Sequence, residues 1–159
     1  MKKKKHHLPA GSKLIASNRR AHRDYDIEDR FETGIVLQGT EVKSLRDGKI
    51  QLKDSYAAFK EGELWLLNSH INEYFPASQF NHDPTRPRKL LMKKRELQKL
   101  RAKVQQEGYT LIPLSVYFKK SWVKVELGLC RGKKQYDQRQ DIAKKEAQRQ
   151  IDRALKRRR

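Results

Sequence analysis

The sequence lacks a second cysteine and has no long hydrophobic run, and both absences restrict the class of protein. Cys130 has no second cysteine to pair with, so a disulfide framework and a cysteine-based zinc site are excluded. The longest clean apolar run, residues 64–67, is far too short to cross a bilayer. Four lysines follow Met1 as in a signal peptide, but the long apolar segment that must come next is missing. We therefore expect a cytoplasmic protein without a membrane partner.

Acidic residues are scarce outside the middle of the chain. Residues 1–23 hold eight Lys and Arg and no Asp or Glu, residues 86–103 hold nine against one, and residues 131–159 hold twelve against four. Residues 24–85 have the opposite balance, six against twelve. A surface that serves only solubility mixes the two signs. This segregation, at a net charge of +19, predicts a polyanionic partner, most often a nucleic acid.

A membrane surface also attracts cations and is the alternative partner. Binding there requires a basic helix with a bulky apolar face. The basic C-terminal segment has only small or aliphatic residues for such a face and no aromatic residue after Tyr136. Nucleic acid is therefore favoured.

Short segments rich in β-branched and aromatic residues predict the strands. The five main ones are residues 31–37, 52–59, 64–71, 110–118 and 122–129. Residues 13–17 are expected to add a further strand. Glu61-Gly62 and residues 119–121 have the composition of hairpin turns.

Two helices are predicted between these strands. A short one has Thr40 as its N-cap, Val42 and Leu45 as a buried pair, and Gly48 just after its end. A longer one covers residues 93–106, where apolar residues recur at i, i+3 and i+7.

The order of three strands, a long helix and two strands predicts a mainly β fold with helices, a closed five-stranded Greek-key barrel of the OB type. In such a barrel the helix plugs one mouth. We expect residues 1–130 to form this barrel with a basic N-terminal arm, and residues 131–159 to form a basic C-terminal tail. The tail has no Gly or Pro after residue 134 and only a thin apolar stripe, which predicts disorder when free and a helix when bound.

Three basic constellations are candidates for RNA contact. In the first, the guanidinium groups of Arg19 and Arg20 match phosphate oxygens, and Tyr25 can stack on an unpaired base; the alternative is a solvated basic strand edge. The second, around Arg88 and Lys89, is expected on the loop and first turn of the plug helix, near the rim where OB proteins bind oligonucleotides. The third, residues 132–134, offers a flexible glycine beside two lysine charges.

The acidic run of residues 24–32 is the best case for an enzyme, because clustered carboxylates can bind Mg²⁺ for a nuclease. Its members are Asp24, Asp26, Glu28, Asp29 and Glu32. Their alternation with Tyr25 and Ile27 is typical of an exposed strand face, and pairing with the basic blocks would also account for them. No set of nucleophile, base and orienting group is visible, and the five histidines lack metal-ligand spacing. We therefore expect neither catalysis nor a cofactor.

Several strings give the chain a family resemblance. They include Phe-Glu-Thr-Gly-Ile at residues 31–35, Glu-Val-Lys-Ser-Leu-Arg at 41–46, Arg-Lys-Leu-Leu at 88–91 and Gly-Lys-Lys at 132–134. With these strings the chain resembles the small protein B family, the SsrA-binding proteins of bacteria, over nearly its whole length. It departs from the family pattern at Arg23, where His is usual, and at Gln138, where Lys is usual.

This resemblance implies a partner of transfer-messenger RNA in trans-translation. Members of the family hold the tRNA-like domain of that RNA and bring it to stalled ribosomes, with elongation factor Tu in the delivery complex through the shared RNA. The implied RNA-binding residues are Asn18, Arg19, Arg20, Tyr25, Glu32, Lys43, Arg46, Arg88, Lys89 and Leu91. The tail is implied to occupy the decoding centre of the small subunit and the mRNA channel through Gly132, Lys133, Lys134, Asp137, Gln138, Arg139, Lys144, Lys145, Ala154 and Leu155.

The competing prediction is a ribosome-associated OB-fold protein or RNA chaperone without a dedicated transfer-messenger RNA partner. Both readings share the barrel and the basic extension, so charge and fold do not separate them.

Overall fold

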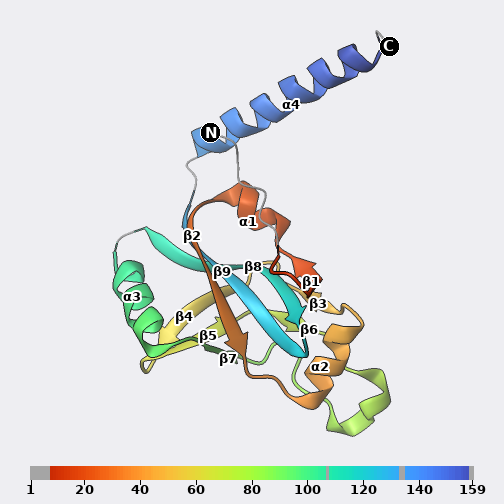
Figure 1. The fold of residues 1–159 in the computed structure, drawn as a ribbon, viewed down its shortest axis with the longest axis vertical. Helices are drawn as coiled ribbons and strands as arrows, with labels where there is room; N and C mark the ends of the chain where they lie inside the picture. Colours follow the sequence, from red (N-terminus) through yellow and green to blue (C-terminus); the bar gives the residue numbers. More distant parts are fainter. Residues whose placement is uncertain (1–7, 107, 133–134, 158–159) are drawn as a thin grey trace.

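The structure, a computed structural model, describes residues 8–106, 108–132 and 135–157. The strands are β1 (Ser12–Ser17), β2 (Tyr25–Ile35), β3 (Ile50–Gln51), β4 (Tyr56–Lys60), β5 (Glu63–Leu67), β6 (His70–Ile71), β7 (Arg88–Leu91), β8 (Tyr109–Lys119) and β9 (Trp122–Gly132). The helices are α1 (Arg19–Asp24), α2 (Gly39–Arg46), the 3₁₀ helix η1 (Phe75–Phe80), α3 (Lys94–Val104) and α4 (Gln135–Arg157). Figure 1 shows the strands wound around one another, with the helices at the periphery.

The main sheet closes on itself. Its pairing order is β1-β8-β4-β5-β7-β2-β9, and β9 pairs again with β8. The strands β8, β4, β5, β7, β2 and β9 therefore form a ring, and β1 extends it at β8. The core inside contains buried side chains from β4, β5, β7, β8 and β9, among them Leu64, Leu90 and Leu127, and β2 adds the partly buried Phe31 and Ile35. The predicted mainly β fold with helices, of the OB type, is confirmed.

Both predicted hairpin turns are present. Glu61 and Gly62 connect β4 to β5 with φ of 54° and 77°, which two-residue turns of this hand require. Lys119 pairs with Trp122, so Lys120 and Ser121 form the turn between β8 and β9.

The ring has six strands instead of the predicted five, because β7 was missed. The prediction that Arg88 and Lys89 lie on a loop and the first turn of the plug helix was wrong. These residues alternate between the interior and the surface of the sheet, with Arg88 and Leu90 buried. Their strand fills the gap between β5 and β2, pairing Leu64 with Leu90 and Gly34 with Leu91.

The first strand after α1 is longer than predicted. The acidic segment of residues 26–29, which precedes the predicted strand, belongs to β2, because β9 pairs with this segment as far as Gly132, opposite Tyr25. A register shift between Ile27 and Asp29 inserts one extra residue. The predicted strand 64–71 is instead divided into β5 and β6 around Asn68, whose φ is 60°. The predicted strand 52–59 starts only at Tyr56, as β4.

The short helix α2 differs from its prediction at the N-cap and in its buried face. Its N-cap is Gln38, and the Thr40 hydroxyl lies 2.8 Å from His82 Nδ1 instead. Leu45 is buried as expected, but Val42 is only half-buried, and Glu41 and Ser44 are the other buried residues. The helix therefore packs a polar face inward, which periodicity of apolar residues cannot detect.

The long helix α3 covers the barrel core with the predicted apolar stripe. Leu100 is fully buried, Leu97 and Val104 pack at its side, and Gly108 follows with a φ of 84°. Cys130 lies in a smaller apolar cluster under α1, where burial raises the pKa of its thiol to about 11. The thiol therefore stays protonated and acts as a core side chain.

The C-terminal helix α4 projects away from the barrel (Figure 1). Its described side chains are all exposed. It is the helix that the sequence predicts for the bound tail, while disorder of the free tail stays a prediction. No helix in the described part of the chain is both long and apolar enough to span a membrane.

Candidate nucleic-acid interface

Glu32 lies on the outer face of β2, where two residues of β8 hold its carboxylate. The buried Tyr117 donates its hydroxyl hydrogen to Oε2, and Lys119 Nζ donates to Oε1 at 3.1 Å. Partial burial alone would raise the pKa of Glu32, but these hydrogen bonds and the charges of Lys119 and Lys124 outweigh it and lower the pKa. Burial and the hydrogen bond to Glu32 in turn raise the pKa of Tyr117. Glu32 is therefore an ionised acceptor fixed in place beside two cations.

A cleft of about 580 Å³ opens next to Glu32. It is lined by Arg30, Phe31, Glu32, Gly34, Leu91, Met92, Lys93, Glu96 and Lys124. Leu91, at the end of β7, leaves 48% of its surface exposed there. It lies against Gly34 of β2, where an added Cβ would be 3.3 Å from Leu91 Cβ. The lining of the cleft thus combines apolar side chains with three cations and two carboxylates.

A second hollow of about 550 Å³ continues this surface and shares Gly34, Leu91 and Lys124 with the cleft. Trp122, the first residue of β9, forms part of its wall and is 71% exposed. An exposed indole beside a lysine suits stacking on an unpaired base with a phosphate nearby. Sequence reasoning did not name Trp122 or Lys124 as site residues, because they read as part of a strand. The signal available in the sequence was the position of Trp122 directly after the predicted hairpin turn of residues 119–121.

The first predicted constellation is a helix, so the strand-edge alternative for these residues was wrong. Asn18 caps α1, since its Oδ1 accepts from the N–H of Ala21 at 3.3 Å. Its Nδ2 donates to the carbonyl of Pro113 at 3.0 Å, where β8 has a register shift. Asn18 is buried and fastens α1 to the barrel, while Arg19 and Arg20 are exposed on it.

A smaller hollow of about 270 Å³ lies beside α1. Arg20, the half-buried Tyr25 and Tyr56 line it, and Arg20 Nη1 lies 3.9 Å from Asp54 Oδ1. The structure therefore brings the predicted Arg20 and Tyr25 together, in a hollow that shares no lining residue with the cleft beside Glu32.

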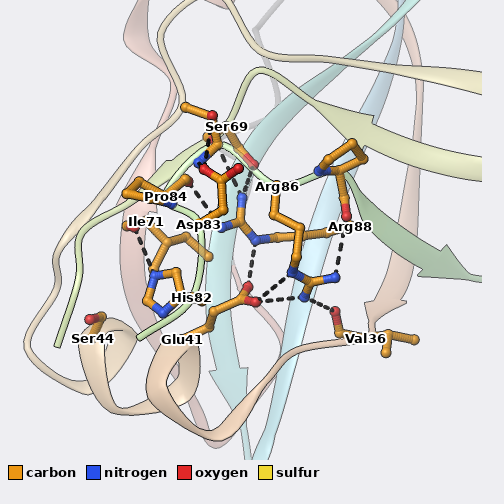
Figure 2. Close-up of polar contacts among 12 residues, drawn as sticks. Val36, Glu41, Ser44, Ser69, Ile71, His82, Asp83, Pro84, Arg86 and Arg88 are labelled. Atoms are coloured by element: carbon orange, nitrogen blue, oxygen red, sulfur yellow. Dashed lines mark hydrogen bonds and ion pairs between the residues drawn. The ribbon is translucent and has the colours of Figure 1, made fainter. Parts of the chain in front are cut away.

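Arg88 differs from the other predicted RNA-binding residues because its side chain is fully buried (Figure 2). Its Nε donates to Glu41 Oε2 at 2.5 Å, and its Nη1 donates to Ser69 Oγ at 3.0 Å. Arg86 Nε donates to Glu41 Oε1 at 2.9 Å. The expectation that Arg88 contacts RNA directly does not fit this position, since it is an internal ion-pair residue that joins β7 to α2.

The remaining predicted cations of the body are accessible. Lys89 lies half-buried on β7 with its Nζ 2.8 Å from Glu63 Oε1. Lys43 and Arg46 are exposed on α2, and Lys43 Nζ lies 5.5 Å from the centre of the Tyr74 ring.

The acidic run is largely paired within the chain. Asp29 Oδ2 lies 3.4 Å from Lys103 Nζ, Glu28 Oε1 lies 3.6 Å from Arg131 Nε, and Glu28 Oε2 accepts from the Tyr109 hydroxyl at 2.6 Å. Within the described residues, no three His, Cys, Asp or Glu side chains are grouped so that they could hold a metal ion. These carboxylates thus have intramolecular partners, as the sequence allowed.

The predicted tail residues begin at the last residue of the ring. Gly132 ends β9, opposite Tyr25. Lys133 and Lys134 lie outside the described residues, and Asp137 and Gln138 belong to α4 with side chains that are not described. The other predicted tail residues, Arg139, Lys144, Lys145, Ala154 and Leu155, lie on α4 and are exposed.

Comparison with known proteins matches the predicted resemblance. A family model described as "SmpB protein" matches residues 15–157. The SsrA-binding protein of Desulfitobacterium hafniense is 53% identical over 143 residues, 90% of this chain and 92% of that protein. The SsrA-binding protein of Thermobifida fusca is 54% identical over 158 residues, 99% of each. A solved chain described as "tmRNA-SmpB: a journey to the center of the bacterial ribosome" has a TM-score of 0.65 and 52% identity, over 76% of this chain and 85% of that one.

The match to the family model spans most of the chain, including β2, β7, β9 and α4. The relatives exceed half identity over nearly their full length. The predicted resemblance is therefore confirmed, and this chain belongs to the SmpB protein family.

Proposed function

We propose that this protein binds the tRNA-like domain of transfer-messenger RNA and delivers it to stalled ribosomes for trans-translation. Relatives more than half identical to it are SsrA-binding proteins, and the similar solved chain carries the words tmRNA and ribosome in its description. The protein acts by binding and not by catalysis, so it requires no cofactor. Its place of action is the cytoplasm, where ribosomes translate.

The cleft beside Glu32 is the observation that carries the proposal. An ionised carboxylate held by Tyr117 and Lys119 accepts hydrogen bonds from base amino groups or ribose hydroxyls, and its fixed geometry lowers the entropy lost on binding. Lys93 and Lys124 supply cations for phosphates, and Leu91 supplies an apolar contact. This arrangement suits a folded RNA read by its shape and its backbone.

The second arm of the proposal assigns residues 1–130 to the RNA and residues 131–159 to the ribosome. The helix α4 presents exposed cations, including Arg139, Lys144 and Lys145, to a ribosomal RNA channel. A messenger RNA in that channel excludes the helix sterically, because the two would occupy the same space. The tail therefore engages vacant channels, and elongation factor Tu joins the complex through the shared RNA.

Sequencing the RNA that stays bound to the purified protein after stringent washing tests the proposal. We expect one abundant structured RNA with a tRNA-like end. Bulk ribosomal RNA would favour the chaperone alternative. Magnesium-dependent cleavage of the bound RNA that stops on adding a chelator would favour a nuclease.

A further inference from the structure

Two phenylalanines on the loop after β6 lie in solvent. Phe75 is 94% exposed and Phe80 is 79% exposed, at the two ends of η1. Large aromatic side chains in a soluble domain normally contribute to its core. Two of them presented together on one short turn mark an interaction surface.

The loop that carries them is closed at its base. The N–H of Tyr74 donates to Asn81 Oδ1 at 2.7 Å, and Asn81 Nδ2 donates to the carbonyl of Tyr74 at 2.8 Å. This reciprocal pair holds the two ends of the turn together as two strands would be held. Both rings are therefore displayed from a fixed frame.

The chain below the loop is also fixed by buried polar contacts (Figure 2). His82 is 3% exposed, and its ring nitrogens lie 2.8 Å from Thr40 Oγ1 and 2.9 Å from the carbonyl of Ile71. Arg88 Nη2 donates to the carbonyl of Pro84 at 3.0 Å from within the ion pair with Glu41. A buried ion pair contributes little net stability, so its effect here is to hold this irregular segment in one geometry.

A lysine lies beside the base of the loop. Lys43 of α2 has its Nζ 5.5 Å from the centre of the Tyr74 ring, and the Ser44 hydroxyl donates to the carbonyl of Asn72 at 2.6 Å. Figure 1 shows the yellow-green loop next to α2. Exposed rings on a loop whose neighbouring Tyr74 lies beside a lysine, on a chain of net charge +19, have the composition of single-stranded nucleic-acid sites. A protein-docking patch would instead surround the rings with more apolar surface.

We propose that Phe75 and Phe80 stack on unpaired bases of transfer-messenger RNA while Lys43 contacts its phosphates. The inference rests on the proposed function and extends the interface to a loop that sequence reasoning did not consider. Figure 1 places the loop and α4 at opposite ends of the molecule. Because the proposed function directs α4 to the ribosome, an RNA bound at the loop, at the other end of the molecule, is the transfer-messenger RNA that is delivered.

Two double variants separate stacking from general apolar contact. Phe75→Leu with Phe80→Leu keeps apolar surface but removes the aromatic faces, whereas Phe75→Tyr with Phe80→Tyr keeps both. Affinity is measured for a transcript of the tRNA-like domain, and thermal unfolding checks that both variants fold. We expect the leucine variant to lose about tenfold in affinity per ring and the tyrosine variant to match the original protein.

Each other outcome overturns the inference. Unchanged affinity of the leucine variant excludes stacking. Intact transcript binding with weakened binding to purified ribosomes without transfer-messenger RNA assigns the loop to the ribosome. A third double variant, Phe75→Ser with Phe80→Ser, tests for an apolar protein partner. Such a partner is indicated if this variant keeps its affinity for the transcript but no longer rescues stalled ribosomes, while the leucine and tyrosine variants still rescue them.

A competition with bulk tRNA separates this inference from the proposed function. If the original protein does not prefer the transcript over bulk tRNA, both fail. If it does and the leucine variant binds equally well, only the loop assignment fails. A photoreactive phenylalanine analogue at position 75 adds a direct readout, where crosslinks to unpaired nucleotides of the transcript support the inference and crosslinks confined to paired stems oppose it.

Discussion

Glu41 and Arg88 form an ion pair inside the protein, with Arg88 Nε 2.5 Å from Glu41 Oε2 and neither side chain exposed. Arg86 shares the same carboxylate from the surface side. The pair joins α2 to β7. Through the hydrogen bond from Arg88 to the Pro84 carbonyl, it also holds the segment that follows the loop of Phe75 and Phe80. A residue that the sequence offers as an RNA contact thus acts as an internal support.

Removing the Glu41 charge should destabilise the protein strongly. Glu41→Gln leaves the Arg88 guanidinium buried and unpaired, which is expected to lower the free energy of unfolding by about 3–5 kcal/mol. Urea unfolding followed by circular dichroism measures it. The matched control is Glu63→Gln, which breaks the exposed pair with Lys89 and should cost less than about 1 kcal/mol. Equal losses in the two variants would contradict the internal-support role.

A methyl group at position 128 should not fit. An added Cβ on Gly128 would lie 2.9 Å from Leu114 Cδ1 and 3.1 Å from Cys130 Sγ, so Gly128→Ala should lower the free energy of unfolding by about 1–3 kcal/mol. Adding Leu114→Val removes the two clashing Cδ atoms of Leu114, though not Cys130 Sγ, and should make the alanine less harmful. Urea unfolding of the four combinations measures this coupling, and simple additivity would show that the clash does not limit stability.

Glu32 should stabilise the fold in a pH-dependent way. Its pKa is lower in the folded protein than in the unfolded chain, where it is about 4.3. Its contribution is therefore complete above about pH 5 and is lost as the pH falls through the lowered folded pKa. The free energy of unfolding is compared between the original protein and Glu32→Gln across this range. We expect the difference to shrink in acid, and a constant difference would argue against the shift.

Lys124 should contribute one phosphate contact. Lys124→Ala is expected to weaken binding to the tRNA-like domain and to reduce the slope of log affinity against log salt by about 1. Electrophoretic mobility or fluorescence titrations at several salt concentrations measure the slope. Lys60→Ala, an exposed lysine of the β4–β5 hairpin, serves as the control and should leave the slope unchanged. The same slope change in both variants would indicate a delocalised charge effect.

Truncation after Arg131 should separate the two proposed activities. The shortened chain keeps the ring of strands and is expected to bind transfer-messenger RNA nearly as well as the full chain. Without α4 it should fail to rescue ribosomes, as measured by tagging of a product from a message without a stop codon. Equal loss of RNA binding and rescue would contradict the division between residues 1–130 and 131–159.

Much of the fold follows from local patterns in the sequence. The strands β8 and β9, the apolar stripe of α3 and the two hairpin turns depend on alternation, helical spacing and turn chemistry within a few residues. The missed strand β7 is short and begins with Arg88, a residue that is buried only because Glu41 lies 47 positions away in the sequence. A buried arginine has no local signal, so its pattern reads as a basic loop.

The candidate site divides in the same way. Charge blocks and family strings pointed to Glu32, Leu91 and the cations of the tail. They could not show that Asn18 is a buried cap. They also could not show that Trp122 and Lys124 border the same surface as Leu91, because β9 and β7 are brought together only by their pairing with β2.

Net charge, charge segregation and short strings do not depend on how the chain packs, so the family and the kind of partner could be predicted before the fold was known. Which charges face solvent depends on the folded arrangement. Burial is a property of neighbours brought together across the ring, so Arg88 became an internal ion-pair partner while Phe75 and Phe80 were left exposed.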